Sequence, residues 1–385
     1  MQSVTKPRVA SASGGGIGID GGSATIKQSV IEANTAGDYG GGIDARGGTQ
    51  LTLVDVTLSG NEAANGGGIA SVVPLAVTGS TVADNFGTYG AGIFSRGKAT
   101  LTDSVVSGNQ GDLGGGIYAA GELNLTGTQV YSNFAFGAYG YGGGVMLNDG
   151  TLSVIRGAFT DNQANLGGGL YVRGVGTATD VAITSNDGGL GGGLYVFEGR
   201  YASHGGRVAS NAASGDGGGV YAQAGQLLLD GTSVTENTAV RDGGGLFVQP
   251  DAVVEVSGQT SVSNNTAASG GGVRNLGRLT MQDVRLIGNQ ATGTEVEPPE
   301  GEDPLPPVGG LGGGVLNEGT ATLARVLVAN CEALRGGGVA NEKTLGLENV
   351  TLSGNLAANG GGGLFNAQGA ATLRSVTMAA NDTDP

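Results

Sequence analysis

Gly114-Gly115-Gly116-Ile117, followed by Val130-Tyr131-Ser132-Asn133, contains the two motifs that decide the fold. The motifs are Gly-Gly-Gly-Φ and Φ-x-x-Asn, where Φ is apolar, and each recurs fourteen times along the chain. The interval is 24 to 29 residues, with one longer interval, and the one variant of the first motif is Gly90-Ala91-Gly92. Such strict self-similarity predicts a solenoid, in which each repeat stacks on the next.

Both motifs can be followed through the whole chain. The apolar residue of the glycine motif is Ile17, Ile43, Ile69, Ile93, Ile117, Val145, Leu170, Leu194, Val220, Leu246, Val273, Val315, Val339 and Leu364. The second motif ends at Asn34, Asn61, Asn85, Asn109, Asn133, Asn162, Asn186, Asn211, Asn237, Asn265, Asn289, Asn330, Asn355 and Asn381.

Short segments between the motifs, such as Leu51-Thr52-Leu53 and Leu123-Asn124-Leu125, alternate apolar and polar residues. This alternation is typical of β-strands, and no segment carries a helical apolar stripe. A repeat of short strands buries its apolar face only if each strand pairs with its equivalent in the next repeat. The sequence therefore predicts an all-β fold, a single-stranded parallel β-helix of about fourteen coils.

The glycines and asparagines are expected to form the corners of the coils. Stacked tight corners need positive φ and close backbone approach, which a Cβ would obstruct. The asparagines are expected near the αL conformation, with side-chain amides bonded to the next coil's asparagine or to a free backbone group. Because this role accounts for the whole ladder, we do not assign the asparagines to catalysis.

Composition excludes several classes of function. The net charge of −15 repels phosphate backbones, so nucleic acid is a poor candidate partner. No apolar run is long enough for a transmembrane helix, and the first thirteen residues lack the apolar region of a signal peptide. The one cysteine, Cys331, permits no intrachain disulfide, and no Cys/His metal constellation is present. No metal or other cofactor is expected.

The repeat varies in length mainly at one corner, between the asparagine and the next glycine motif. We expect an N-terminal tail at 1–13 and one β-helix domain at 14–385, interrupted by a proline-rich, acidic loop at 290–309. That loop is predicted to be a solvated arm of polyproline II type. Variation confined to one face of a solenoid often marks its binding face.

The same corner gathers six of the eighteen aromatic residues, two coils apart. These side chains could form a binding site by stacking on sugar rings or by packing against a protein partner. The alternative is that they pack onto their own coil. These ligand-binding candidates are Phe86, Tyr89, Phe134, Phe136, Tyr139 and Tyr141.

A second aromatic series directly follows the glycine motif. If Φ points inward, strand alternation turns the next residue outward. An external ladder of offset-stacked rings is therefore predicted, and it would stiffen the sheet or present a ligand-binding stripe. Its members are Phe94, Tyr118, Met146, Tyr171, Tyr195, Tyr221 and Phe247.

Evidence for an active site is weak. Glycoside chemistry needs carboxylates that converge on adjacent coils, yet Asp55, Asp103, Asp180 and Asp283 share a register position without being neighbours. The one histidine, His204, lies in the least repeat-like strand. We consider it a weak catalytic candidate together with Arg200 and Arg207, because no paired base or nucleophile accompanies it.

The repeats resemble those of the polymorphic outer membrane proteins and related bacterial surface β-helix proteins. Gly114–Tyr118 is similar to the Gly-Gly-Ala/Gly-Ile hallmark, and Phe159-Thr160-Asp161-Asn162 matches Phe-x-x-Asn. The resemblance covers roughly 14–381. It implies a right-handed β-helix in a bacterial protein that is extracellular or on the outer cell surface, with an adhesive or structural role.

Three functions remain open from the sequence. The first is a non-enzymatic adhesive or structural protein that binds carbohydrate or a host or matrix protein through the aromatic corner. The second is a carbohydrate-active enzyme, a polysaccharide lyase or hydrolase, and the third is a mechanical spacer. Because both end segments are too short to cap the end coils, we expect part of a longer polypeptide or an end-to-end assembly.

Overall fold

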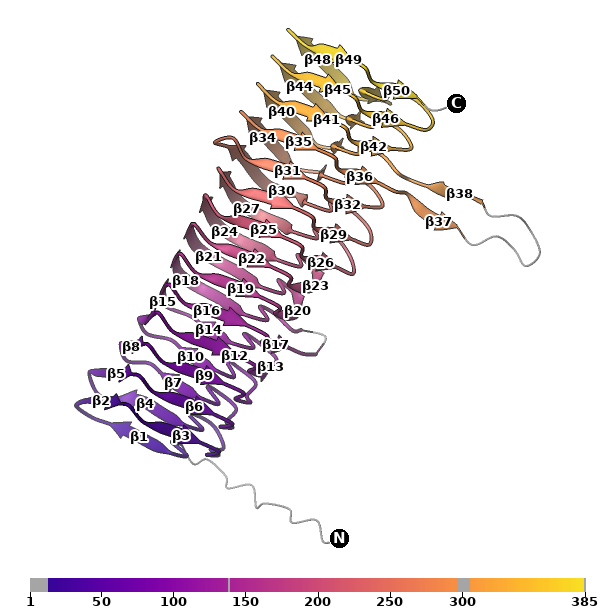
Figure 1. The fold of residues 1–385 in the computed structure, drawn as a ribbon. Helices are drawn as coiled ribbons and strands as arrows, with labels where there is room; N and C mark the ends of the chain where they lie inside the picture. Colours follow the sequence, from indigo (N-terminus) through magenta and orange to yellow (C-terminus); the bar gives the residue numbers. More distant parts are fainter. Residues whose placement is uncertain (1–12, 138, 297–304, 384–385) are drawn as a thin grey trace. The chain divides into compact units, whose positions relative to one another are not determined.

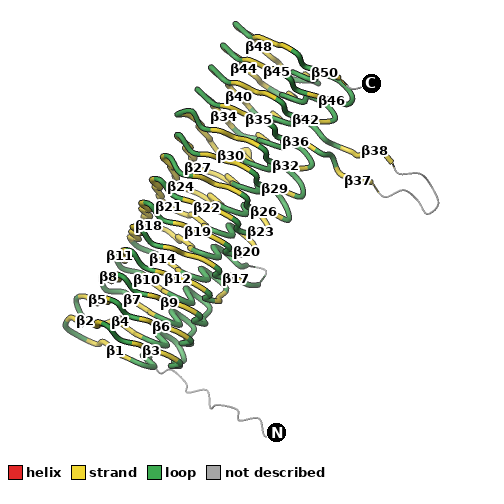
Figure 2. Tube along the Cα trace, in the orientation of Figure 1, coloured by secondary structure: helices red, strands yellow, loops and turns green. Residues whose placement is uncertain are grey.

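A computed structural model describes residues 13–137, 139–296 and 305–383, so the predicted N-terminal tail lies almost entirely outside the described residues. The chain divides into two compact units, 1–158 and 159–385, and each is described by itself. Within the described residues every regular element is a strand, and no helix is present (Figure 1, Figure 2). Accordingly, these residues contain no helix that could cross a membrane. The all-β prediction is confirmed.

Three parallel sheets form the sides of the coils in the first unit (Figure 1). Sheet A contains β1 (Ile17–Asp20), β2 (Ser23–Lys27), β4 (Ile43–Gly47), β5 (Gln50–Val54), β7 (Ile69–Ser71), β8 (Leu75–Thr78), β10 (Ile93–Ser95), β11 (Ala99–Thr102), β14 (Ile117–Ala119), β15 (Glu122–Thr126) and β18 (Val145–Ile155). Sheet B contains β3 (Val30–Glu32), β6 (Thr57–Ser59), β9 (Thr81–Ala83), β12 (Val105–Ser107) and β16 (Gln129–Tyr131). Sheet C contains β13 (Gln110–Gly111) and β17 (Phe134–Ala135).

The second unit has the same three sides. Sheet A contains β21 (Leu170–Thr179), β24 (Leu194–His204), β27 (Val220–Asp230), β30 (Leu246–Ser257), β33 (Val273–Asn275), β34 (Arg278–Gln282), β39 (Val315–Asn317), β40 (Thr320–Ala324), β43 (Val339–Asn341), β44 (Thr344–Glu348), β47 (Leu364–Asn366) and β48 (Ala370–Arg374). Sheet B contains β19 (Ala158–Thr160), β22 (Ala182–Thr184), β25 (Arg207–Ala209), β28 (Ser233–Thr235), β31 (Ser261–Ser263), β35 (Arg285–Ile287), β41 (Leu327–Ala329), β45 (Thr351–Ser353) and β49 (Thr377–Ala379). Sheet C contains β20 (Gln163–Leu166), β23 (Asp187–Leu190), β26 (Ala212–Ala213), β29 (Thr238–Ala239), β32 (Thr266–Ala267), β36 (Gln290–Ala291), β42 (Glu332–Ala333), β46 (Leu356–Ala357) and β50 (Asp382–Thr383).

Equivalent residues of successive repeats lie side by side. Ile93, for example, is in register with Ile69 on one side and Ile117 on the other, in parallel strands. All three side chains are buried, as strand alternation requires of the inward positions. Within the described residues the glycine motif starts a turn of this kind fourteen times, six in the first unit and eight in the second. The predicted β-helix of about fourteen turns is confirmed.

Each glycine of the motif meets a different steric limit. Gly66, the first, has φ +63°, and a Cβ there would lie closer than 3.0 Å to the carbonyl group of Ile69. At Gly115, the second, an added Cβ would lie 2.7 Å from the carbonyl oxygen of Gly143 in the next coil. Gly116, the third, would place a Cβ 3.0 Å from Cγ of Asn133. The third glycine therefore makes room for the asparagine, which links the two motifs physically.

The asparagine side chains form an inward ladder of hydrogen bonds. Asn85 is fully buried; its Nδ2 donates to Oδ1 of Asn109 at 2.9 Å, and its Oδ1 accepts from Nδ2 of Asn61 at 3.0 Å. The predicted αL conformation belongs instead to the preceding residue, such as Asp84 with φ 54°. That part of the prediction is wrong, because the positive φ turns the chain so that the asparagine points into the coil.

The ladder prediction also fails at one coil. Asn330 occupies the αL position, with φ 52°, and Cys331 takes the ladder position. Its backbone N–H donates to Oδ1 of Asn355 at 3.0 Å, while Sγ lies 3.9 Å from Nδ2 of Asn289. Burial raises the pKa of the Cys331 thiol to about 11, so this thiol stays protonated at neutral pH.

The long insertion begins and ends as a hairpin rather than as the predicted polyproline II arm. β37 (Thr294–Val296) pairs antiparallel with β38 (Leu305–Val308), and the pair extends away from the coils of the second unit (Figure 1). Residues 297–304 lie outside the described residues. Antiparallel pairing satisfies backbone groups that a polyproline II segment would leave to water.

Tyr201 has a polar hydroxyl group buried in the apolar interior of the second unit. Its side chain is 1% exposed, and its hydroxyl has no hydrogen-bond partner, so burial raises the pKa of this phenol. Gly176, its partner in the preceding coil, gives the ring its space, since a Cβ there would lie 2.6 Å from Cδ2 of Tyr201. The hydroxyl loses hydration and gains no bond in return.

We expect Tyr201→Phe to raise the free energy of unfolding by about 1 kcal/mol, because it removes a buried, unpaired hydroxyl. Urea denaturation of the full chain would measure it. Tyr195→Phe is the matched control, since the Tyr195 hydroxyl donates to Gln223 and its loss should lower stability. Destabilisation by both substitutions would show that the Tyr201 hydroxyl has a partner.

Candidate functional site

The six predicted aromatic residues lie at one corner of the first unit, between sheets B and A. Two register rows run across the coils there: Phe86, Gln110 and Phe134 form one row. The other contains Tyr89, Leu113 and Tyr141. Phe136 and Tyr139 lie in the inserted loop of the last of these coils. The structure therefore places the predicted residues at one corner, on two coils separated by the coil of Gln110 and Leu113.

Four of these side chains face solvent. The exposed fraction is 44% for Phe86, 38% for Tyr89, 42% for Phe136 and 73% for Tyr139. Phe134 is half-buried, with its ring centroid 5.8 Å from that of Phe136. Soluble proteins rarely leave several aromatic rings together on the surface unless they bind something there.

Backbone hydrogen bonds hold the inserted loop against the preceding coil. Phe136 N–H donates to the carbonyl of Gly111 at 2.8 Å, and Tyr141 N–H donates to that of Asp112 at 3.3 Å. Within the loop, Gly140 N–H donates to the carbonyl of Gly137 at 3.1 Å. The backbone at Phe136 and at Tyr141 is thus bonded to the preceding coil.

The second aromatic series is stacked as predicted but is not external. In the second unit the rings of Tyr171, Tyr195, Tyr221 and Phe247 follow one another with centroids 4.9 to 5.4 Å apart and planes within 9°. The prediction of exposure is wrong, because neighbouring coil segments cover the rings. All seven side chains are 1 to 7% exposed: Phe94, Tyr118, Met146, Tyr171, Tyr195, Tyr221 and Phe247.

The covering groups come from the corner itself. In the first unit Tyr39 packs edge-on against Phe94 at 6.1 Å, and Tyr89 packs edge-on against Tyr118 at 5.7 Å. The tyrosine hydroxyls are also bonded, since Nδ2 of Asn148 donates to the Tyr118 hydroxyl at 2.7 Å. The stack is therefore a second, smaller core outside sheet A, and not a binding stripe.

A partly buried charged cluster adjoins the stack in the second unit, and sequence reasoning missed it. Arg241 bonds Asp216 at 2.8 Å, while Arg274 pairs with both Asp242 and Glu318, the latter at 2.7 Å. Burial raises the pKa of Asp216 and of Asp242. The two aspartates do occupy one register position on adjacent coils, immediately before the glycine motif. That repetition was visible in the sequence, but both carboxylates are engaged by arginine.

His204 has a partner that the sequence did not indicate. Its Nδ1 lies 3.1 Å from Oδ2 of Asp230 in the next coil, and Ser257 donates to Oδ1 of the same carboxylate at 3.2 Å. The aspartate lies between serine and histidine, so the histidine cannot activate the serine as in a catalytic triad. Within the described part of the chain, no hydrogen bond or ion pair joins His204 to Arg200 or Arg207.

The non-adjacent aspartates have a steric explanation. Asp55 takes φ 55°, and its Oδ1 lies over Gly79 of the next coil, where a Cβ would be 2.7 Å away. Asp180 lies over Gly205 in the same way at 2.6 Å. At these two positions the following coil carries a glycine, whereas the residue in register after Asp283 is Arg325, which pairs with it at 2.7 Å. In none of these cases does a second carboxylate follow on the next coil, as a glycosidase would need.

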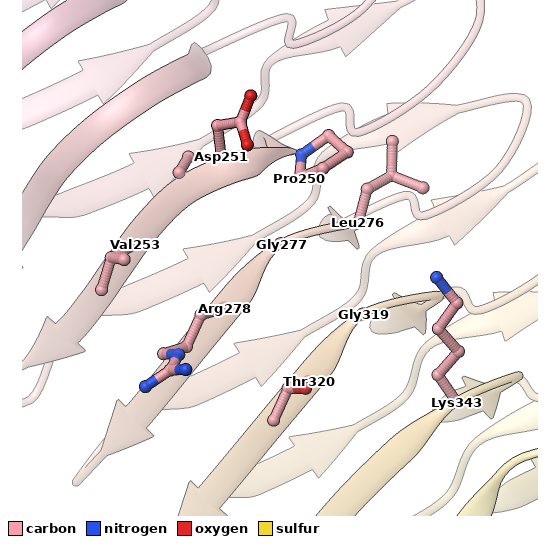
Figure 3. Close-up of a pocket in the computed structure, with 10 residues that line it drawn as sticks. Pro250, Asp251, Val253, Leu276, Gly277, Arg278, Gly319, Thr320 and Lys343 are labelled. Atoms are coloured by element: carbon pink, nitrogen blue, oxygen red, sulfur yellow. The ribbon is translucent and has the colours of Figure 1, made fainter.

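A groove of about 390 Å³ opens on sheet A of the second unit (Figure 3). β30 is a continuous strand, whereas the next coil turns sharply between β33 and β34, and this step creates the groove. Gly277 and Gly319 line it together with Asp251, Arg278 and Lys343 (Figure 3). With one carboxylate, the groove lacks an acid–base pair. No group of three His, Cys, Asp or Glu side chains that could hold a metal ion occurs among the described residues.

Residues 3–135 match the family model of the right handed beta helix region. This right-handed β-helix match covers the first five asparagines of the ladder and Phe86, Tyr89 and Phe134 of the corner. Together with the parallel coils it supports the predicted right-handed parallel β-helix. No curated protein and no solved structure matches the chain.

Proposed function

We propose that this right-handed β-helix is a non-enzymatic adhesive protein of the bacterial cell surface or exterior, which binds carbohydrate through the aromatic corner. The observation that carries the proposal is the set of exposed rings at one corner, with Phe86 and Tyr89 on one coil and Phe136 and Tyr139 in the inserted loop two coils later. Aromatic faces stack on the apolar faces of sugars, and their polar edges suit a wet surface. The placement at the cell surface rests on the resemblance of the repeats to polymorphic outer membrane proteins.

A triple change, Phe86→Ala with Phe136→Ala and Tyr139→Ala, is expected to lower binding to a glycan array and to host cells at least about tenfold. The removed rings supply both apolar area and stacking energy. The array and a cell-adhesion assay would measure the loss on the full chain.

The matched control replaces exposed apolar residues away from the corner, Val30→Ala, Ile155→Ala and Val175→Ala, which should leave binding unchanged. Unchanged binding by the aromatic variant would contradict the site, and no binding by the wild-type chain would favour a mechanical spacer. Release of unsaturated or reducing ends from a polysaccharide panel, abolished by His204→Ala, would favour a carbohydrate-active enzyme built on His204 and Asp230.

A further inference from the structure

We infer that the aromatic corner takes an uncharged, ribbon-like β-1,4-linked glycan that lies across the coils, parallel to the axis of the first unit. This inference rests on the proposed function and names the ligand class and its direction. Two observations carry it: the spacing of the rings and the charge of the corner.

The rings repeat every second coil. In the row Phe86, Gln110, Phe134, two aromatic residues flank one polar residue. Adjacent strands are about 4.8 Å apart, so the two rings are about 10 Å apart along the axis. A β-1,4-linked ribbon has a two-fold screw, in which alternate sugars present the same face at a similar repeat. Two successive like faces would therefore meet Phe86 and Phe134.

The middle position suits the intervening sugar. Gln110 is exposed, and its side-chain amide can both donate and accept hydrogen bonds. In a two-fold ribbon the sugar between the two stacked ones presents its opposite face to this position, and its hydroxyl groups lie along the two edges of the ribbon. The Gln110 amide can bond hydroxyls at the rim of that sugar. Phe86, Gln110 and Phe134 therefore match three successive sugars of the glycan, with the rings on the outer two and the amide on the middle one.

The charge of the corner excludes acidic glycans. Its segments in the first unit, 35–39, 62–65, 86–89, 110–113 and 134–141, contain Asp38, Glu62 and Asp112 but no lysine or arginine. In a chain of net charge −15, these carboxylates would repel a polyuronate or sulfated glycan. Arg46, which lies over the Tyr39 ring at 4.0 Å, is already paired with Asp44 at 2.8 Å. Stacking and hydrogen bonding, without ion pairs, leave a neutral sugar chain as the ligand.

The test compares three probes on the full chain by calorimetry: cellohexaose, cellobiose and a hexasaccharide of β-1,4-linked uronate. We expect cellohexaose to bind measurably more tightly than the other two. Phe86→Ala and Phe134→Ala should each weaken cellohexaose binding about tenfold, as expected for loss of one stacking ring. Tyr131→Ala removes an exposed ring from sheet B, outside the corner, and should change cellohexaose binding less than threefold.

Phe134→Leu repeats the test with the apolar volume kept, in case Phe134→Ala perturbs the loop. Equal or tighter binding of the uronate would overturn the ligand class. A loss with Tyr89→Ala but not with either Phe134 variant would overturn the direction, since the glycan would then follow one coil. Both results differ from failure of the proposed function, in which no glycan binds or the triple aromatic variant binds as well as the wild type.

Discussion

Asn85→Ala lowers the free energy of unfolding by about 4 kcal/mol, on the basis of the bonds that it removes. The Asn85 side chain accepts from both the backbone N–H and Nδ2 of Asn61, each at 3.0 Å. It donates to the carbonyl of Leu58 at 3.2 Å and to Oδ1 of Asn109 at 2.9 Å. Alanine leaves the Asn61 backbone N–H and the Leu58 carbonyl buried without these bonds, and each such group costs about 1 to 3 kcal/mol.

Urea denaturation, followed together with amide exchange of the neighbouring coils, measures this effect in a repeat protein that need not unfold in two states. Asn124→Ala is the control, because Asn124 is partly exposed and bonds only the Glu122 side chain. Asn85→Cys, the residue that the chain carries at Cys331, should cost less than Asn85→Ala. An Asn85→Ala chain as stable as the Asn124→Ala chain would mean that the ladder contributes nothing to stability.

Gly66→Ala is expected to cost about 3 to 5 kcal/mol, or to prevent accumulation of folded protein, because two penalties combine. The positive φ of +63° is unfavourable for alanine by about 1 kcal/mol or more, and the new methyl group overlaps the Ile69 carbonyl. Ile69 cannot move away, since its strand β7 is paired on both sides, with β4 and β10.

Thermal unfolding of the purified chain measures the change. Gly18→Ala provides the comparison within the same unit, because no atom lies within 4 Å of a Cβ at Gly18 and no positive φ is found there. That control should be neutral or slightly stabilising, since it restricts the unfolded chain. Equal melting temperatures for the two variants would contradict the steric account of the glycine motif.

The fold could be predicted from the sequence because the same pattern recurs fourteen times, so errors at single residues do not alter it. Errors appear where one residue departs from the pattern. Asn330 satisfies the motif one position early, counted from Leu327, whereas the strand places Val328 inward and Cys331 in the ladder. Only the register of neighbouring coils distinguishes the two alignments.

Whether a side chain is exposed to solvent was harder to predict than whether it points into or out of the coil. Alternation correctly turns Tyr118 and Tyr195 away from the inner core, but the corner covers them with other side chains. Asp216 and Asp242 each stand directly before a glycine motif, a register position that differs from the one shared by Asp55, Asp103, Asp180 and Asp283. The exposed rings at Phe86 and Tyr139 were found because they break the repeat, and deviation from the repeat is the signal that sequence reasoning can use for a site.

Among the described residues, the side-chain hydrogen bonds that join one asparagine of the ladder to the next point the same way, and Cys331 interrupts the series. In each unit, the amide of one coil donates to the oxygen of the next, as Asn61 does to Asn85 and Asn237 does to Asn265. The aligned amide dipoles give each stack a polarity. The last coil of a stack therefore has side-chain amide donors without acceptors. The next coil supplies an acceptor only when its own asparagine is in register. A coil that is shifted by one residue would leave those donors without acceptors. The ladder therefore penalises a shift of register when a coil is added.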